Sequence, residues 1–126
     1  MFLSPFHSVN DSKIIISAEQ GSSFAKIISN DFNPIHDPES KRFCVPGDLL
    51  FALVLARYGL SENMEFNFSG MVSGNTELLF PESPRDNFQI LDGRDKSYLE
   101  VSRRGQIVQD MTAIESLIRN YVYFSG

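Results

Sequence analysis

The stretch NDFNPIHDPESKRFCVPGDLLFALVLARYG, residues 30–59, decides how this chain folds. Its second part, Leu49 to Ala56, is apolar at every position, and a helix that is apolar on all sides must be buried on all sides. A short apolar run is also compatible with a buried strand, so its flanking residues decide. Asp48 can cap a helix at its start, and Gly59 can end one. We therefore predict a central helix that the rest of the chain encloses.

The first part of the same stretch is a polar loop, too rich in Pro and Asn for a regular element. It carries Asp31, Asn33 and His36. Asp and Asn in such a sequence commonly form turns by binding backbone amides, and a lone His beside them is commonly a hydrogen-bonded loop residue. A carboxylate and an imidazole that face one cavity can instead exchange protons with a bound water. The residues alone leave both interpretations open.

Composition predicts one domain and disfavours several classes of function. A chain of 126 residues can bury one core but is too short for two, so we predict a single domain over residues 1–126. The net charge of −5 disfavours binding to nucleic acid or to an anionic membrane, and no apolar run is long enough to cross a bilayer. The lone Cys44 favours a cytoplasmic location. His7 and His36 form no familiar metal-ligand spacing, so we expect neither a metal nor a cofactor.

Before the loop, the sequence predicts one short strand and one helix. Residues 13–16 are a β-branched run, which we expect at the edge of a sheet. Ser17 and Gln20 have the spacing of a capping box at a helix start. Three apolar residues repeat at helical spacing and are predicted to bury one face of this helix: Phe24, Ile27 and Ile28.

After the central helix, the pattern changes to strands joined by turns. Apolar and polar residues alternate from Met64, and turns are expected at residues 74–75, 81–84, 92–93 and 104–105. The last turn is predicted to join two strands, residues 98–103 and 107–117. Helices followed by at least four consecutive strands indicate an α+β protein with an antiparallel sheet packed on a helix. A curled sheet wrapped around one buried helix is the hotdog fold, which we expect here.

The segment FAKIISNDFNPIH, residues 24–36, resembles the signature of the MaoC-like dehydratases and (R)-specific enoyl-CoA hydratases. The apolar helix that starts at Gly47 and the segment FSGMVSGNTEL, residues 68–78, are similar to the same family. Together these matches cover most of residues 15–80. The positions that carry the first match are Phe24, Ala25, Asp31, Asn33, Pro34, Ile35 and His36.

This resemblance implies a lyase that hydrates trans-2-enoyl thioesters or dehydrates 3-hydroxyacyl thioesters with (R) specificity. Asp31 and His36 would hold the reacting water and act as acid and base without a metal. Asn33 would support the loop, and a backbone N–H near Gly47 would receive the negative charge that develops on the thioester oxygen. Two basic residues would meet the phosphates of coenzyme A: Lys41 and Arg42.

The expected partners are an acyl thioester, linked to coenzyme A or to an acyl carrier protein, and a second copy of the chain in a homodimer. Exposed strand edges favour such pairing. Asn30 and Asp48 depart from the family pattern, and the segment before Phe43 is one residue shorter than usual. Because the Asp48 carboxylate would bring like charge near the thioester oxygen, a non-catalytic acyl-thioester-binding or regulatory domain is a second hypothesis. A thioesterase is a third, since one fold hosts several activities.

Overall fold

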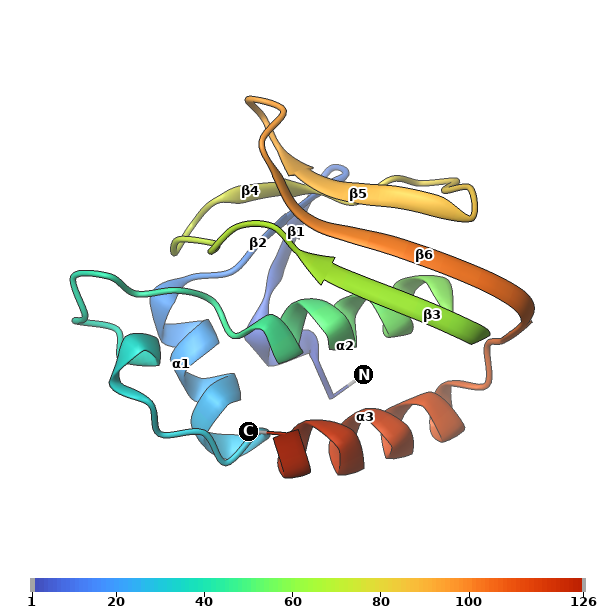
Figure 1. The fold of residues 1–126 in the computed structure, drawn as a ribbon. Helices are drawn as coiled ribbons and strands as arrows, with labels where there is room; N and C mark the ends of the chain where they lie inside the picture. The colour runs from blue at the N-terminus through green and yellow to red at the C-terminus, as the bar shows by residue number, and fades with distance from the viewer. Residues whose placement is uncertain (1, 126) are drawn as a thin grey trace.

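The computed structural model describes the backbone of residues 2–125 and the side chains of residues 2–123. This part of the chain is an α+β structure with one six-stranded antiparallel sheet and three α-helices (Figure 1). Two short 3-10 helices, η1 and η2, lie before α2. The elements in chain order are η1 (Ser4–Phe6), β1 (Ser8–Asn10), β2 (Lys13–Ile15), α1 (Ala18–Ile27), η2 (Pro34–His36), α2 (Gly47–Tyr58), β3 (Leu60–Phe68), β4 (Glu77–Leu79), β5 (Asn87–Asp92), β6 (Ser97–Val108) and α3 (Met111–Ser125).

The strands of the sheet are arranged in the order β1-β2-β4-β5-β6-β3, so β1 and β3 are its edges. The prediction that residues 13–16 form an edge strand is wrong, because β2 pairs with β1 on one side and β4 on the other. The predicted strands after the central helix are confirmed as β3, β4 and β5. Their alternation places the apolar side chains on the face that packs against α2 and the polar side chains on the outer face.

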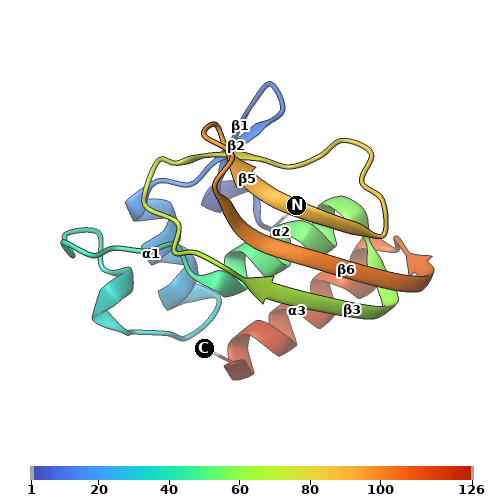
Figure 2. The ribbon, with the colours of Figure 1, turned by 45° about the horizontal axis from the view of Figure 1, so that its top comes forward.

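Helix α2 lies between the sheet and α3 (Figure 1, Figure 2). The predicted central helix is confirmed, and most of its side chains between Leu49 and Leu55 are buried. Gly59 ends it with φ +87°, a conformation that favours glycine. The prediction that Asp48 caps the start is wrong, because α2 begins at Gly47 and Pro46 occupies the N-cap position. None of the helices in residues 2–125 combines the length and apolar character needed to cross a bilayer.

Helix α1 begins as the capping-box pattern predicts. Ser17 Oγ accepts a hydrogen bond from the Gln20 N–H at 3.1 Å, and Gln20 Oε1 accepts one from the Ser17 N–H at 3.0 Å. Phe24 is fully buried and Ile28 partly buried, but the side chain of Ile27 is 71% exposed. The prediction that Ile27 faces the core is therefore wrong. The buried face of α1 is centred on Gly21, Ala25 and Ile28, and Ile27 lies outside it.

The predicted hairpin at residues 104–105 is wrong, because β6 runs through it from Ser97 to Val108. Gly105 has φ +90° inside the strand, and a Cβ there would lie 2.8 Å from the Glu62 side chain of β3. This glycine accommodates the irregular pairing near Ser61 instead of reversing the chain. Of the second predicted strand, residues 107–108 belong to β6, but the rest from Met111 onward is the helix α3. The start of α3 is stabilised by Asp110 Oδ1, which accepts from the Thr112 N–H at 3.0 Å.

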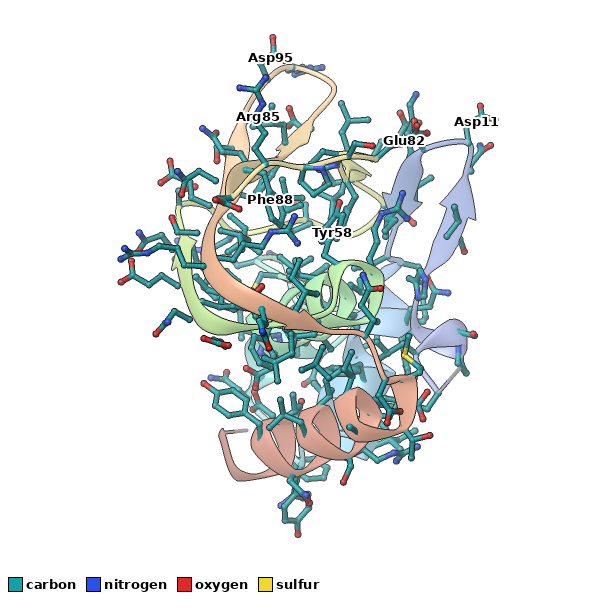
Figure 3. All side chains as sticks on the ribbon, turned by 90° about the vertical axis from the view of Figure 1, so that its right-hand side faces the viewer. Asp11, Tyr58, Glu82, Arg85, Phe88 and Asp95 are labelled. Atoms are coloured by element: carbon teal, nitrogen blue, oxygen red, sulfur yellow. The ribbon has the colours of Figure 1, made fainter. Side chains whose placement is uncertain are left out.

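Tyr58 and Arg103 fasten the β4–β5 connection over the C-terminal end of α2. Tyr58 Oη donates to the Pro81 carbonyl at 2.6 Å, and Arg103 Nη2 donates to the Pro84 carbonyl at 3.1 Å. The Arg103 guanidinium also lies 5.4 Å from the centre of the Phe88 ring. Figure 3 shows Tyr58 and Phe88 between the sheet and α2, whereas the labelled charged residues lie at the margin of the molecule. This end of the core is therefore closed by a tyrosine and an arginine.

Candidate functional site

The loop between α1 and α2 brings Asp31 and His36 together by local turn geometry. Asp31 Oδ1 accepts from the Asn33 N–H at 3.0 Å, and Asn33 Oδ1 accepts from the Ile35 N–H at 3.1 Å. Pro34 then starts η2, for which its fixed φ and missing N–H are suited. The turn-forming interpretation of Asp31 and Asn33 is thus confirmed. The same turns direct the second oxygen of Asp31 toward His36.

The His36 ring lies between a backbone carbonyl and a carboxylate. Its Nδ1 is 2.8 Å from the carbonyl oxygen of Cys44, and its Nε2 is 3.4 Å from Oδ2 of Asp31. A carbonyl oxygen only accepts hydrogen bonds, so Nδ1 carries a proton and donates it. Nε2 is therefore the atom that gains or loses a proton opposite Asp31. The side chains are 11% exposed for His36 and 28% exposed for Asp31, so solvent reaches the carboxylate side of the pair.

The separation between Nε2 and Oδ2 matters for the chemistry of the pair. Charge-assisted N–H···O bonds in proteins are shorter, about 2.7–2.9 Å. At 3.4 Å the two groups are within ion-pair distance but are farther apart than in such a hydrogen bond. A water that contacted both could give a proton to one and receive one from the other. The arrangement therefore suits general acid–base chemistry on water.

Contacts on both sides of the pair hold the loop in place. The Asp31 N–H donates to the Ala25 carbonyl of α1 at 2.7 Å. Lys26 Nζ and Asp37 Oδ1 form an ion pair at 3.0 Å across the loop. Asn30 turns the chain with φ +53°, which Asn adopts more readily than most residues. These contacts connect the position of Asp31 and His36 to the rigid helix α1.

Cys44 contributes its backbone carbonyl to the site while its thiol remains buried. Burial, followed by the negative charge of Asp31, raises the pKa of the Cys44 thiol. Its Sγ lies 3.9 Å from Nδ1 of His36, but the raised pKa disfavours the reactive thiolate. Sequence reasoning missed the role of Cys44, because a carbonyl acceptor is present in every residue and leaves no signal in residue type.

Gly47 is the first residue of α2, so its backbone belongs to the turn whose N–H groups lack helical partners. The ring of Phe68, at the end of β3, lies against it: a Cβ at position 47 would be 3.3 Å from the Phe68 Cε1. Asn33 faces its own turn and is exposed. Lys41 and Arg42 are also exposed, on the loop between η2 and α2. Among the described residues, no hydrogen bond or ion pair joins either cation to Asp31 or His36, so their predicted role stays a prediction.

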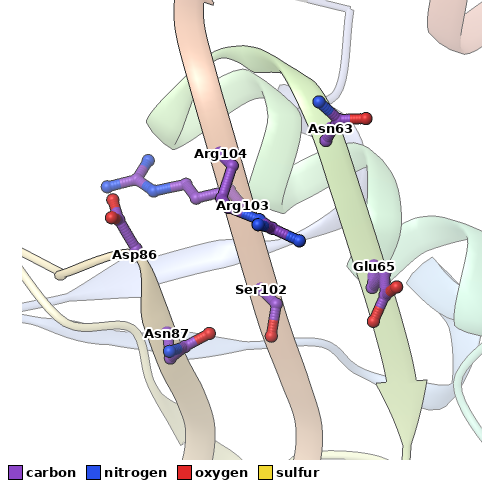
Figure 4. A pocket seen from close by; sticks show the side chains of 7 residues that line it. All are labelled: Asn63, Glu65, Asp86, Asn87, Ser102, Arg103 and Arg104. Carbon is purple, nitrogen blue, oxygen red and sulfur yellow. The ribbon is translucent and has the colours of Figure 1, made fainter.

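A polar cavity of about 380 Å³ lies elsewhere, on the outer face of the sheet (Figure 4). Ser102 on β6 pairs with Glu65 on one side and with Asn87 on the other, and this small side chain is surrounded by longer ones. The cavity lies on the face of the sheet opposite α2, so it is separate from Asp31 and His36. Its lining residues are Asn63, Glu65, Asp86, Asn87, Ser102, Arg103 and Arg104. Within residues 2–125, we find no cluster of three or more metal-ligating side chains.

Comparison with protein-family models gives a match that covers the whole chain. A family model described as "Protein of unknown function (DUF3581)" matches residues 1–126. The searches of curated proteins and of solved structures give no significant match. The assignment to the MaoC-like dehydratases is therefore wrong. Its motif is explained by local geometry, because Asp31, Asn33 and Pro34 are the residue types that this turn requires. The chain belongs to the DUF3581 family.

Proposed function

We propose that Asp31 and His36 form an acid–base pair that adds water to trans-2-enoyl thioesters or removes it from 3-hydroxyacyl thioesters. The observation that carries the proposal is the environment of the His36 ring. Its Nδ1 is fixed by the Cys44 carbonyl while its Nε2 faces Asp31 Oδ2 at 3.4 Å. One such hydrogen bond, from Nδ1 to a backbone carbonyl, is enough to hold a histidine that has only a structural role. The second contact, with a partly exposed carboxylate, supports proton exchange with a ligand or water.

The pair can complete hydration without any net change in its own protonation. A neutral Nε2, or the Asp31 carboxylate, takes one proton as the water oxygen bonds to C3 of the enoyl group. The π electrons move toward the thioester carbonyl, and one proton then passes from the pair to C2. Dehydration runs the same steps in reverse. Because the Nδ1–H of His36 stays hydrogen-bonded to the Cys44 carbonyl, the ring can cycle between its neutral and charged forms without rotating.

The thioester oxygen needs a donor while it carries negative charge, and the first turn of α2 supports this role. Gly47 follows Cys44 by three residues, so the start of α2 is connected directly to the segment that holds His36. A helix N-terminus presents unpaired N–H groups and a partial positive charge. The N-cap residue Pro46 gives no side-chain hydrogen bond to this turn, in which the Leu49 N–H donates to the Pro46 carbonyl at 3.0 Å.

The carboxylate of Asp48 supports a second candidate, an acyl-thioester-binding domain that does not catalyse. Asp48 lies in the first turn of α2 and is partly buried. A negative charge there opposes the charge that develops on the thioester oxygen. Under this candidate, the ligand binds but the double bond is not hydrated. The two candidates therefore predict the same binding and different turnover.

The architecture supports the finer interpretation of the fold as a hotdog and of the assembly as a homodimer. A six-stranded antiparallel sheet lies over one buried helix, α2. Strand β3 is a nine-residue edge, beside a cluster in which the Phe51 ring lies 5.0 Å from that of Phe66 and 4.9 Å from that of Tyr121. Long edges and partly exposed aromatic side chains favour pairing with a second copy. The unpaired Cys44 supports a reducing, cytoplasmic location.

The test is the loss of enoyl absorbance when the purified chain is mixed with crotonyl-CoA. We expect D31N and H36Q each to lower the turnover rate by about 100-fold or more, the usual contribution of one acid–base group. E39Q is the matched control, because Glu39 is an exposed carboxylate on the same loop. Turnover in D31N and H36Q equal to that of the unmodified chain would contradict the proposal. Binding of butyryl-CoA without turnover in any variant would establish the second candidate.

A further inference from the structure

The polar cavity on the outer face of the sheet has no part in the chemistry proposed for Asp31 and His36. Its volume of about 380 Å³ suits a small ligand. Ser102 of β6 lies at its centre, where a short side chain leaves space between the longer side chains of β3 and β5 (Figure 4). The cavity therefore gives a ligand contacts with three strands that are hydrogen-bonded to one another.

The charged groups of this cavity are not neutralised within the chain. Two carboxylates and two guanidinium groups line it: Glu65, Asp86, Arg103 and Arg104. None of these four forms an ion pair with another residue that the structure describes. Arg103 is already engaged, because it donates to the Pro84 carbonyl and lies over the Phe88 ring. One guanidinium, that of Arg104, therefore remains beside two carboxylates, and the cavity has an excess of one negative charge.

The two carboxylates belong to opposite sides of β6. Glu65 is on β3, where it pairs with Ser102. Asp86 directly precedes β5, and its carbonyl accepts from the Arg103 N–H at 2.9 Å. Since neighbouring strands are about 4.8 Å apart, the two acidic residues are separated by about 10 Å across β6. Figure 4 shows Asp86 on the β5 side, near the arginines, and Glu65 on the β3 side. A ligand that satisfies both carboxylates therefore has a positive group at each end.

The guanidinium of Arg104 calls for a negative group as well. Arginine binds carboxylates through two parallel hydrogen bonds. In an α-amino acid the carboxylate and the ammonium group are attached to the same carbon, which matches an arginine and Asp86 at one end of the cavity. A cationic side chain then extends toward Glu65 at the other end. Uncharged side chains in the lining supply further donors and acceptors for such a ligand: Asn63, Asn87 and Ser102.

We infer that this cavity binds a free α-amino acid with a cationic side chain, such as lysine or arginine. Arg104 holds its carboxylate, Asp86 its α-ammonium group and Glu65 the cation of its side chain. The inference is independent of enoyl hydration, because Asp31 and His36 are not in the lining of the cavity.

The test is a titration of the full nitrogen-15-labelled chain with L-lysine, followed by amide NMR. We expect saturable shifts around Ser102, with a Kd of about 1 mM or tighter. Norleucine lacks the side-chain cation, and cadaverine lacks the carboxylate. Each should bind about tenfold more weakly than L-lysine, because each loses one charge-assisted hydrogen-bonding group.

Substitutions assign each charged group to its part of the ligand. E65Q should remove the preference for L-lysine over norleucine, and R104Q the preference for L-lysine over cadaverine. D86N should weaken L-lysine and norleucine alike. E19Q is the matched control, since Glu19 is an exposed carboxylate of α1 and its loss changes the net charge equally. It should leave all the affinities unchanged.

A second pair of variants tests the shape of the cavity without changing its charge. S102F fills the space between β3 and β5 and should abolish binding, whereas S102A keeps the space and should retain it. Phenylalanine is well tolerated in strands, and thermal melting checks that S102F is folded.

Three results would overturn the inference. The first is no saturable shift with L-lysine up to about 10 mM, ten times the expected Kd. The second is equal affinity for L-lysine, norleucine and cadaverine, or tighter binding of cadaverine. The third is binding in S102F as tight as in the unmodified chain. Shifts that cluster at Asp31 and His36 instead of Ser102 would place the ligand elsewhere and would also overturn it.

Discussion

Tyr58 is the residue whose ionisation is most strongly opposed by its surroundings. Burial raises its pKa to about 12, and the nearby Arg57 and Arg103 only partly offset that effect. Because the folded pKa lies above the unfolded value of about 10, the folded state holds the proton more tightly than the unfolded state. The stability this provides is complete below about pH 10 and is lost as the pH rises to about 12.

We therefore predict a loss of about 2 kcal/mol in the free energy of unfolding between about pH 10 and 12 that depends on Tyr58. Urea unfolding at several pH values measures it, with Y58F as the comparison. Y58F should cost about 1 kcal/mol at neutral pH through the lost bond to Pro81, and should show a smaller decline at high pH. Tyr98, whose pKa is also raised, is present in both proteins, so the difference isolates Tyr58. Parallel pH profiles would contradict the assignment.

At the same scale, the sequence predicted which side chains meet in the loop but not what positions them. Asp31 and His36 could be paired in advance, because Asx turns and Pro34 act over a few residues. The acceptor for Nδ1 is the carbonyl of Cys44, eight residues away, and backbone atoms carry no residue-type signal. The Phe68 ring against Gly47 joins the end of a strand to the start of a helix, a contact that only tertiary structure specifies.

Helix α3 shows where element-scale prediction failed and why. Ile107, Val108, Thr112 and Ile114 are β-branched, and this composition favoured a continuous strand. The helical signal was present in Ile114, Ile118 and Val122, which recur every four residues and are all buried. In contrast, α1 and α2 were predicted because a capping box and a glycine stop are local features. Asp110 lies between β6 and α3, but the β-branched residues continue past it into the helix.

We predict that I118A destabilises the chain by about 2–5 kcal/mol, because Ile118 is 0% exposed between α3 and the rest of the core. L117A is the matched control on the same helix, since Leu117 is 38% exposed and its truncation should cost less than about 1 kcal/mol. Urea denaturation of both variants gives the two values. Equal losses for the two substitutions would mean that α3 does not pack as described.

At the scale of the whole molecule, β3 is the longer of the two sheet edges, and the proposed homodimer would form through it. We predict that light scattering after gel filtration gives twice the chain mass of 14.2 kDa. Lysines on an edge strand oppose pairing, so N63K/N67K should give the monomer mass. N87K is the control, because Asn87 is exposed on β5, which pairs with β6 inside the sheet. A monomer mass for the unmodified chain at every concentration would contradict assembly through β3.

The α+β class could be predicted at this scale because it depends on element order, whereas the strand order could not. β2 lies inside the sheet only because β1 pairs with its outer side. Ser8–Asn10, which form β1, lack the apolar alternation that indicates a strand. The family assignment failed for a related reason. A short loop motif reports turn geometry, which unrelated chains can share, while the match over residues 1–126 reports the whole chain.

The Cys44 carbonyl fixes the Nδ1 proton of His36 and leaves Nε2 facing Asp31 Oδ2, the arrangement on which the proposed function depends. Nitrogen-15 NMR of labelled histidine tests it directly, with H7Q used to assign the two rings. Once the His36 ring is neutral, we predict a protonated Nδ1 and a bare Nε2, with the Nε2 signal changed in D31N. A neutral ring that carries its proton on Nε2 and leaves Nδ1 bare would contradict the account.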